Sequence, residues 1–277
     1  MLALVQATRF NLPTILALVL LGAAALAVLF LVERRVAEPV LPLRLWRRRV
    51  LALSNLGGAG GAASYMAVTA LLPTYVQGVM GCSPRLAGLV VGAGSVSWMF
   101  ASIVAGRLMV RTSYRLTAAI GGAHLVAGGA VLVALGPGGG ALWPAAGSLL
   151  LGIGMGFGNT TFLVAIQGAV EVSERGVATG SQMFMRMIGM SVGAALYGAI
   201  LNAGVQRHVP GAGAKVNQLL DAAARQHLGP EQLARLAEAV AISAHGAFIV
   251  ALAIAAAVLA LNLCFPRRLS PIHASDR

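Results

Sequence analysis

Long apolar runs alternate with short polar segments along the whole chain, and this pattern predicts its secondary structure. Seven runs are long enough to cross a membrane, since about 20 mostly apolar residues span a hydrocarbon core of about 30 Å. The runs cover residues 12–32, 52–78, 86–106, 116–136, 142–166, 177–203 and 244–264. The pattern therefore predicts an all-α, polytopic membrane protein with seven transmembrane helices.

The first run, LPTILALVLLGAAALAVLFLV, is longer than the apolar region of a secretory signal peptide. The sequence VERR at its end offers no small-residue cleavage pattern. We expect this run to be retained as a transmembrane helix.

The only long polar segment is 204–243, between the last two runs. AKVNQLLDAAARQHL and PEQLARLAEAVAI both carry apolar residues at helical spacing, and Gly229-Pro230 separates them. Proline is well placed at the start of a helix. We expect two short amphipathic helices on the outer surface. They serve either as a solvated loop with a weak membrane-facing stripe or in partner binding or gating.

Basic residues mark one side of the membrane. Segment 33–50 carries six arginines, the connection at 107–115 carries three, and the tail from 266 carries three more. Seven alternating helices place these segments on one side, which the positive-inside rule makes cytoplasmic. The N-terminus is then outside and the C-terminus is cytoplasmic. We expect a multi-pass protein of the cell (inner) membrane.

The composition supports this class and excludes others. The chain is 58% hydrophobic and only 10% charged, with a mean hydropathy of +0.84. A soluble domain carries about 25% charged residues, and a disordered chain carries few apolar ones. The formal net charge of +12 comes from clusters between apolar runs rather than from a basic face. The sequence thus predicts the lipid bilayer as a partner and no nucleic acid.

Glycine is abundant, with 35 residues, and many lie inside the predicted helices at a spacing of four. Small residues at this spacing let helix backbones approach closely in lipid. The pairs are Gly57/Gly61, Gly88/Gly92, Gly152/Gly156, Gly154/Gly158 and Gly189/Gly193. We expect these pairs to be packing sites in a mobile bundle.

Enzymatic chemistry has no support in the sequence. None of the eight acidic residues falls inside a predicted run, and no catalytic, cofactor or metal motif is present. The two cysteines, Cys82 and Cys264, fall on opposite membrane faces. His124 is the only histidine well inside a run, and it is either a packed, hydrogen-bonded side chain or a proton relay. His245 lies at the start of the last run, and we expect no special role for it. We predict no enzyme, no cofactor and no metal.

Arg186 is the exceptional residue, because it lies in the apolar stretch QMFMRMIGMSVGAAL. It is roughly 15 Å into its run at 1.5 Å per residue, near the bilayer centre. A central arginine costs about 2.5–3.5 kcal/mol on insertion scales, so it should face the bundle interior or a wet cavity. It either holds the bundle together through carbonyls and water, or lines a substrate cavity with Gln182, Asn159 and His124.

Three stretches together resemble a known family. They are LPTYVQGVMGCSPRLAGL (72–89), AGRLMVRTSYRLTAAIG (105–121) and ERGVATGSQMFMRMIGMSVGAALYGAIL (174–201). They are similar to the C-terminal half of the fourteen-helix drug:proton antiporter branch of the major facilitator superfamily. The second stretch resembles the cytoplasmic loop motif of the family through Gly106, Leu108, Arg111 and Arg115.

The resemblance implies a domain organisation. Residues 1–50 would form a linking transmembrane helix and a basic cytoplasmic loop. Residues 51–265 would form the C-terminal six-helix bundle, with the outer amphipathic loop 204–243, and 266–277 the cytoplasmic tail. Two departures stand out: Val110 replaces the acid of the loop motif and Ser113 a later glycine. In the family, that acid helps to lock the cytoplasmic ends of helices, and this bundle has no acid at that position.

The resemblance also implies proton-coupled efflux of amphipathic small molecules by alternating access between two bundles. Members of this branch have about two six-helix bundles and two linking helices, so this chain supplies one half. We expect no transport without the N-terminal bundle, whose carboxylates would carry the proton. The alternatives are a truncated, non-transporting membrane protein and a seven-helix membrane protein of another class.

Overall fold

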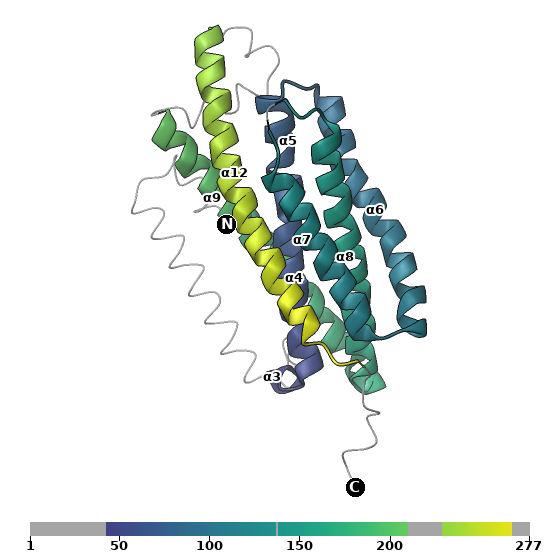
Figure 1. Ribbon diagram of the computed structural model, residues 1–277. Coiled ribbons are helices and arrows are strands. Elements are labelled where there is room, and N and C mark those ends of the chain that lie inside the picture. The colour runs from purple at the N-terminus through teal and green to yellow at the C-terminus, as the bar shows by residue number, and fades with distance from the viewer. Residues whose placement is uncertain (1–42, 137, 210–228, 268–277) are drawn as a thin grey trace, which may run out of the picture.

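The structure, a computed structural model, describes residues 43–136, 138–209 and 229–267 and is a bundle of long helices (Figure 1). Short elements join them at the ends, and the described residues contain no strand. The long helices are α4 (Arg49–Ala70), α6 (Pro84–Arg111), α7 (Tyr114–Val133), α8 (Leu142–Gly168), α9 (Arg175–His208) and α12 (Pro230–Leu263). The short elements are α3 (Leu43–Trp46), α5 (Leu72–Thr74), the π-helical turn η1 (Tyr75–Val79) and the 3₁₀ turn η2 (Val172–Glu174).

These six long helices coincide with six of the seven predicted runs. Five of them, α6, α7, α8, α9 and α12, are long and apolar enough to cross a membrane. In α4, the serine, asparagine and glycine residues dilute the apolar character. The run at 12–32 lies outside the described residues, so the predicted count of seven is not confirmed.

The run at 52–78 is not one regular helix. Its α-helix ends at Ala70, Pro73 follows in α5, and the chain then makes the π-helical turn η1. Proline has no backbone N–H and cannot continue the hydrogen-bond ladder of α4. The connection between this run and the next contains Gly81 at φ 69°, a conformation that favours glycine.

The outer segment differs from the prediction of two short amphipathic helices. Residues 230–242 are not a separate helix, because α12 continues without a break to Leu263. Pro230 does stand in the first turn, as predicted. The other expected helix, 214–228, lies outside the described residues. No glycine or proline able to stop a helix follows Pro230 until Gly246, which a packed helix tolerates.

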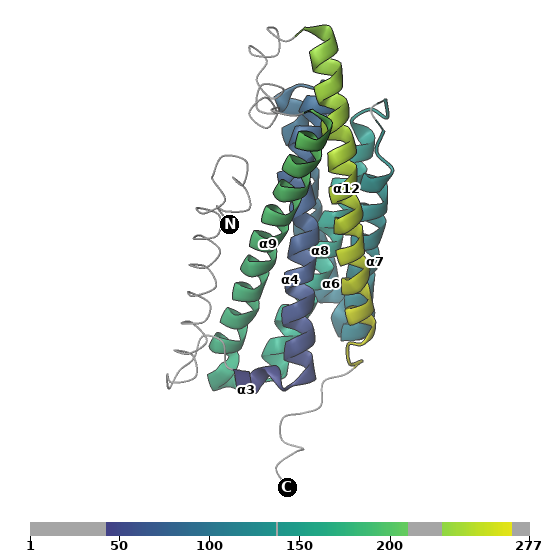
Figure 2. The same cartoon turned by 90° about the vertical axis from the view of Figure 1, so that its left-hand side faces the viewer.

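Two helices are therefore much longer than a bilayer requires. α9 and α12 each contain 34 residues, or about 51 Å at 1.5 Å per residue. Figures 1 and 2 show the start of α12 extending past the other described helices. There, Val205 of α9 packs with Leu236 and Val240 of α12 in a small apolar cluster. This cluster holds the ends of α9 and α12 together.

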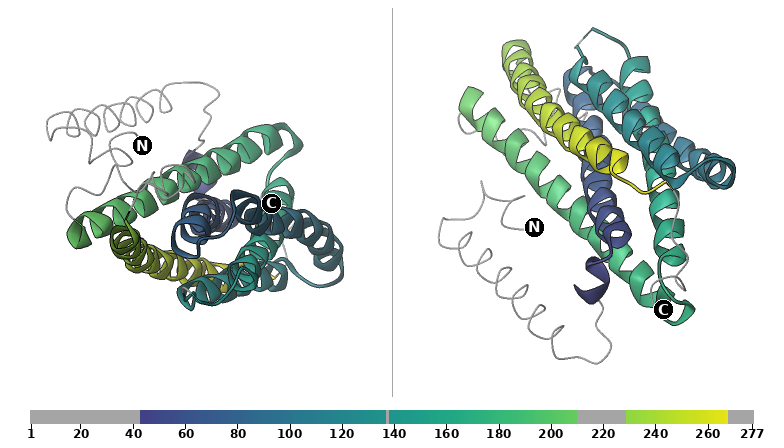
Figure 3. Two further views of the ribbon diagram at one scale, coloured as in Figure 1. Left: turned by 90° about the horizontal axis from the view of Figure 1, so that it is seen from above. Right: turned by 60° about the horizontal axis from the view of Figure 1, so that its bottom comes forward.

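The helices pack in two related sets, seen along the bundle in Figure 3. α8 packs against α6 and α7, while α4 packs against α9 and α12; α7 also packs on α12, and α4 on α8. The main apolar core runs through α4, α7, α8 and α12, with Tyr197 of α9 buried in it. Its hydroxyl donates to the carbonyl of Ala63 at 3.0 Å.

Close backbone approach at glycine is confirmed for some of the predicted pairs. A Cβ on Gly189 or Gly193 would collide with the backbone of Ala59 or Ala63 in α4. Gly152 and Gly156 of α8 meet the backbone of α6 in the same way. For Gly88/Gly92 the prediction is wrong within the described residues, since a Cβ at either position would meet nothing within 4 Å.

Arginines at one end of the bundle bind the C-terminal carbonyls of neighbouring helices. Arg48 donates to the carbonyl of Ala169, just after α8, and Arg49 donates to that of Cys264, just after α12, at 3.0 Å. Arg175 donates to the carbonyl of Gln167 at 3.0 Å. Cations at these positions satisfy the last carbonyls and oppose the negative end of the helix dipole.

Candidate functional site

Arg186 points into the bundle rather than away from it. It lies 11 residues after Arg175, about 16 Å along α9. Its side chain is half-buried, and one terminal nitrogen donates to Oδ1 of Asn159 in α8 at 3.2 Å. The guanidinium therefore bridges α9 and α8 inside the bundle, as the cost of a charge in lipid requires.

A small cavity lies beside this bridge. Its volume is about 10 Å³, close to the minimum that one water molecule needs. The lining residues come from five helices: Gly57, Gly58, Gly61, Leu125, Gly154, Met155, Gly158, Asn159, Phe162, Arg186, Val258 and Asn262. A drug-sized molecule does not fit in this cavity.

Two nitrogen donors near this point have no acceptor among the described residues. Gln182, one turn before Arg186, is 1% exposed, and its Nε2 has no hydrogen-bond partner. Nε of Arg186 has none either. A buried donor without an acceptor costs about 1–3 kcal/mol. No ion pair to Arg186 occurs within the described ranges, so its charge has no carboxylate beside it.

The structure does not bring His124 into this group. Its Nδ1 lies 2.8 Å from the carbonyl oxygen of Ile120, one turn earlier in α7. Its ring stacks on Phe157, with centroids 6.2 Å apart and planes 2° apart. This geometry is that of a packed, hydrogen-bonded histidine.

The loop motif lies where α6 ends and α7 begins. Arg111 and Arg115 are both exposed, and neither forms an ion pair with a described residue. Val110, at the position of the family acid, is 87% exposed. Ser113 has a definite local role, since its hydroxyl accepts from the backbone N–H of Leu116 at 3.2 Å and caps α7.

For the other two motif residues, the surroundings differ. Leu108 packs against the small apolar cluster of α6 and α8, whereas a Cβ on Gly106 would meet nothing within 4 Å.

Across the part of the chain that is described, no three metal-ligating side chains come together.

Buried polar residues on α4 and α12 were not singled out from the sequence. Nδ2 of Asn262 donates to the carbonyl of Ala118 at 2.8 Å, and Asn262 also lines the Arg186 cavity. Nδ2 of Asn55 donates to the hydroxyl of Ser181 at 3.4 Å. Both asparagines are polar residues inside predicted apolar runs. Arg186 was identified from the sequence by the same feature.

Comparison with known proteins gives a consistent family. The model of the Major Facilitator Superfamily matches residues 1–194. The chain is 27% identical over 189 residues to "Multidrug transporter protein MdtP" of Bacillus subtilis, covering 66% of this chain and 35% of that protein. It is 33% identical over 191 residues to "Tetracycline resistance determinant" of Streptomyces rimosus, covering 68% of this chain and 55% of that protein.

A further relative is "Multidrug resistance protein 3" of Bacillus subtilis, 23% identical over 191 residues, with 69% and 37% covered. The chain thus spans about a third to a half of the length of these curated relatives. With its apolar helices and a family match over most of its length, the chain is a multi-pass membrane protein that belongs to the major facilitator superfamily.

Proposed function

We propose that this chain forms the C-terminal half of a proton-coupled secondary transporter that exports amphipathic small molecules. The family supports transport by alternating access, in which one bundle rocks against another around a central site. The names of the relatives refer to multidrug transport and tetracycline resistance, which supports efflux. The described helices form one such bundle, and a second bundle would complete the transporter.

The observation that carries this proposal is the unsatisfied polarity around Arg186. A guanidinium keeps its proton in proteins, so Arg186 is not a proton carrier. It can lower the pKa of a nearby carboxylate or bind an anionic group of the substrate. Gln182 adds a second donor one turn away, and Asn159 orients the guanidinium. We propose that the acceptor for these donors is an acid of the second bundle or the substrate itself.

The orientation is part of the proposal. Arginines gather at the end of the bundle that carries α3, the start of α7 and the end of α12, which the positive-inside rule assigns to the cytoplasm of a cell (inner) membrane. The opposite end, with η1 and the start of α12, would face outward. The N-terminus would then lie outside and the C-terminus inside.

Reconstitution tests both parts of the proposal. The chain is placed in proteoliposomes alone, and then together with the first six-helix bundle of a related antiporter, and ethidium efflux is driven by a pH gradient. We expect no efflux from the chain alone and efflux from the pair. Transport by the chain alone would overturn the half-transporter proposal.

Substitutions then test Arg186 in the active pair. Arg186→Ala should abolish efflux, and Arg186→Lys should retain part of it, because the charge stays while the fork of donors is lost. Arg85→Ala, at an exposed arginine near the start of α6, is the matched control and should transport normally. Unchanged efflux in both Arg186 variants would leave that residue only a packing role.

A further inference from the structure

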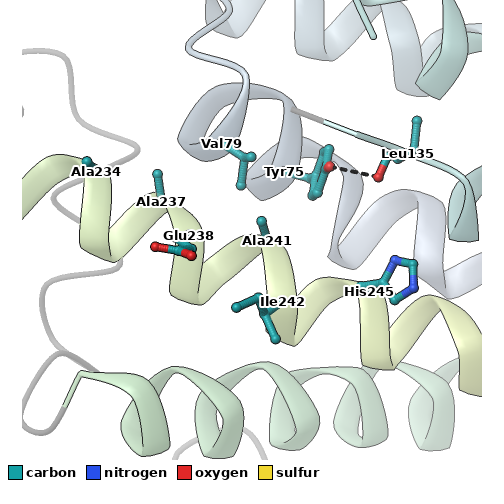
Figure 4. Close-up of a pocket in the computed structure, with 9 residues that line it drawn as sticks. All are labelled: Tyr75, Val79, Leu135, Ala234, Ala237, Glu238, Ala241, Ile242 and His245. Atoms are coloured by element: carbon teal, nitrogen blue, oxygen red, sulfur yellow. Dashed lines mark hydrogen bonds between the residues drawn. The ribbon is translucent and has the colours of Figure 1, made fainter. Parts of the chain in front are cut away.

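A second, much larger hollow lies at the opposite end of the bundle from α3. It is a groove of about 620 Å³ between the first turns of α12, the turn η1 and the end of α7 (Figure 4). The lining residues are Tyr75, Val79, Leu135, Ala234, Ala237, Glu238, Ala241, Ile242 and His245. The volume falls in the range of about 300–1,000 Å³ that is usual for small-molecule sites.

The sequence of α12 explains why the groove is open. Ala234, Ala237 and Ala241 lie at a spacing of three and four residues, so they share the face that looks towards η1. An adjacent face carries Leu236 and Val240, which pack against α9. Large side chains thus hold α12 in place, while small ones leave space on the side of η1.

The polar groups of the groove favour one kind of ligand. Glu238 is the only formally charged residue among those that line it, and it makes no ion pair with a described residue. The Tyr75 hydroxyl is already used, since it donates to the carbonyl of Leu135 at 3.3 Å. His245, when neutral, offers an acceptor nitrogen. The lining therefore presents a negative charge and acceptors on an apolar wall, with no fixed positive charge.

We propose that this groove binds a free amphipathic organic cation, with its apolar body over the alanine face and its charge beside Glu238. The site shares no residue with the Arg186 cavity. The inference goes beyond the proposed function, because it concerns equilibrium binding at a different place and holds whether or not Arg186 takes part in transport.

Equilibrium dialysis of radiolabelled tetraphenylphosphonium against the purified full chain in detergent micelles tests the site, with protein-free micelles as the background. We expect saturable binding. Triphenylphosphine oxide, a neutral analogue, should compete poorly. Glu238→Gln should weaken binding up to about fivefold, the range of an exposed ion pair. Glu231→Gln, which removes an acid paired with Arg235 outside the groove, is the matched control.

A second pair of variants tests the groove itself. Ala241→Phe should abolish saturable binding by filling the groove, and Ala256→Phe, at an exposed alanine of the same helix, should not. Normal binding by both Glu238→Gln and Ala241→Phe would overturn the proposal, as would equal binding of the neutral analogue. Loss of binding on adding phosphatidylethanolamine would also overturn it, because the groove would then be a lipid site.

Discussion

The contact between α4 and α9 makes a quantitative prediction about Gly189. A Cβ at this position would lie 2.6 Å from the carbonyl carbon of Ala59 and 2.7 Å from its Cα, and closer still to the carbonyl oxygen. Ordinary contact begins at 3.4 Å, so clearing the carbonyl carbon alone requires the two backbones to move apart by about 0.8 Å, and clearing the closer oxygen requires more. Because the clash is with backbone, no side-chain rotation relieves it.

The cost follows from the packing that this shift disturbs. A gap of 0.5–1 Å removes a quarter to a half of each dispersion contact along the interface, and overpacking generally costs about 1–3 kcal/mol. Alanine also gains up to about 1 kcal/mol of helix propensity over glycine. A control is therefore needed that gains the same propensity without the clash.

Gly180 provides that control, since it lies on the same helix and a Cβ there would meet nothing within 4 Å. Thermal unfolding of both variants in one detergent, followed by circular dichroism, compares them directly. Gly180→Ala should be as stable as the parent or more so, and Gly189→Ala should be less stable than Gly180→Ala by about 1–3 kcal/mol, a shift of several degrees. Equal midpoints for the two variants would refute the close approach of α4 and α9.

Two further predictions concern the bundle and its orientation. Tyr197→Phe removes the buried hydrogen bond to the carbonyl of Ala63 and should lower the free energy of unfolding by about 0.6–1.5 kcal/mol in the same assay; an unchanged value would mean that the bond contributes nothing. In intact cells, a membrane-impermeant maleimide should label the Cys264→Ser variant through Cys82, whereas the Cys82→Ser variant should react through Cys264 only after permeabilisation. The reverse pattern would contradict the proposed orientation.

The apolar pattern predicted the helices well because lipid demands long runs of apolar residues whatever the tertiary contacts. It also placed Pro230 and Arg186 correctly, since each has a strong local preference: proline for a first helical turn and arginine for a polar partner. Of the residues predicted to lie together, Arg186 and Asn159 do meet. His124 does not join them, because successive residues of a helix point in different directions, and on α7 it is Leu125 that lines the cavity beside Arg186.

What the sequence did not reveal depends on contacts between distant segments. The first part of α12, residues 230–243, is held against α9 by Leu236 and Val240. The polar sequence of this segment does not show that α9 lies beside it. His245 drew no interest, because its neighbours in the groove, Tyr75 and Leu135, are far away in the chain. The open surroundings of Gly88 and Gly92 likewise depend on which face of α6 meets α8.

The hydrogen bonds from Arg48 and Arg49 to the ends of α8 and α12 depend on how many helices are inserted in the membrane. Arg49 is the first residue of α4, and the carbonyl that it binds follows α12. In a membrane the two can meet only if the chain between them crosses the bilayer an even number of times. Arg48 and the end of α8 impose the same condition on the helices between them. A molecule in which a single helix failed to insert would strand donor and acceptor on opposite faces of the membrane. The two hydrogen bonds therefore form only when the number of helices inserted between donor and acceptor is even.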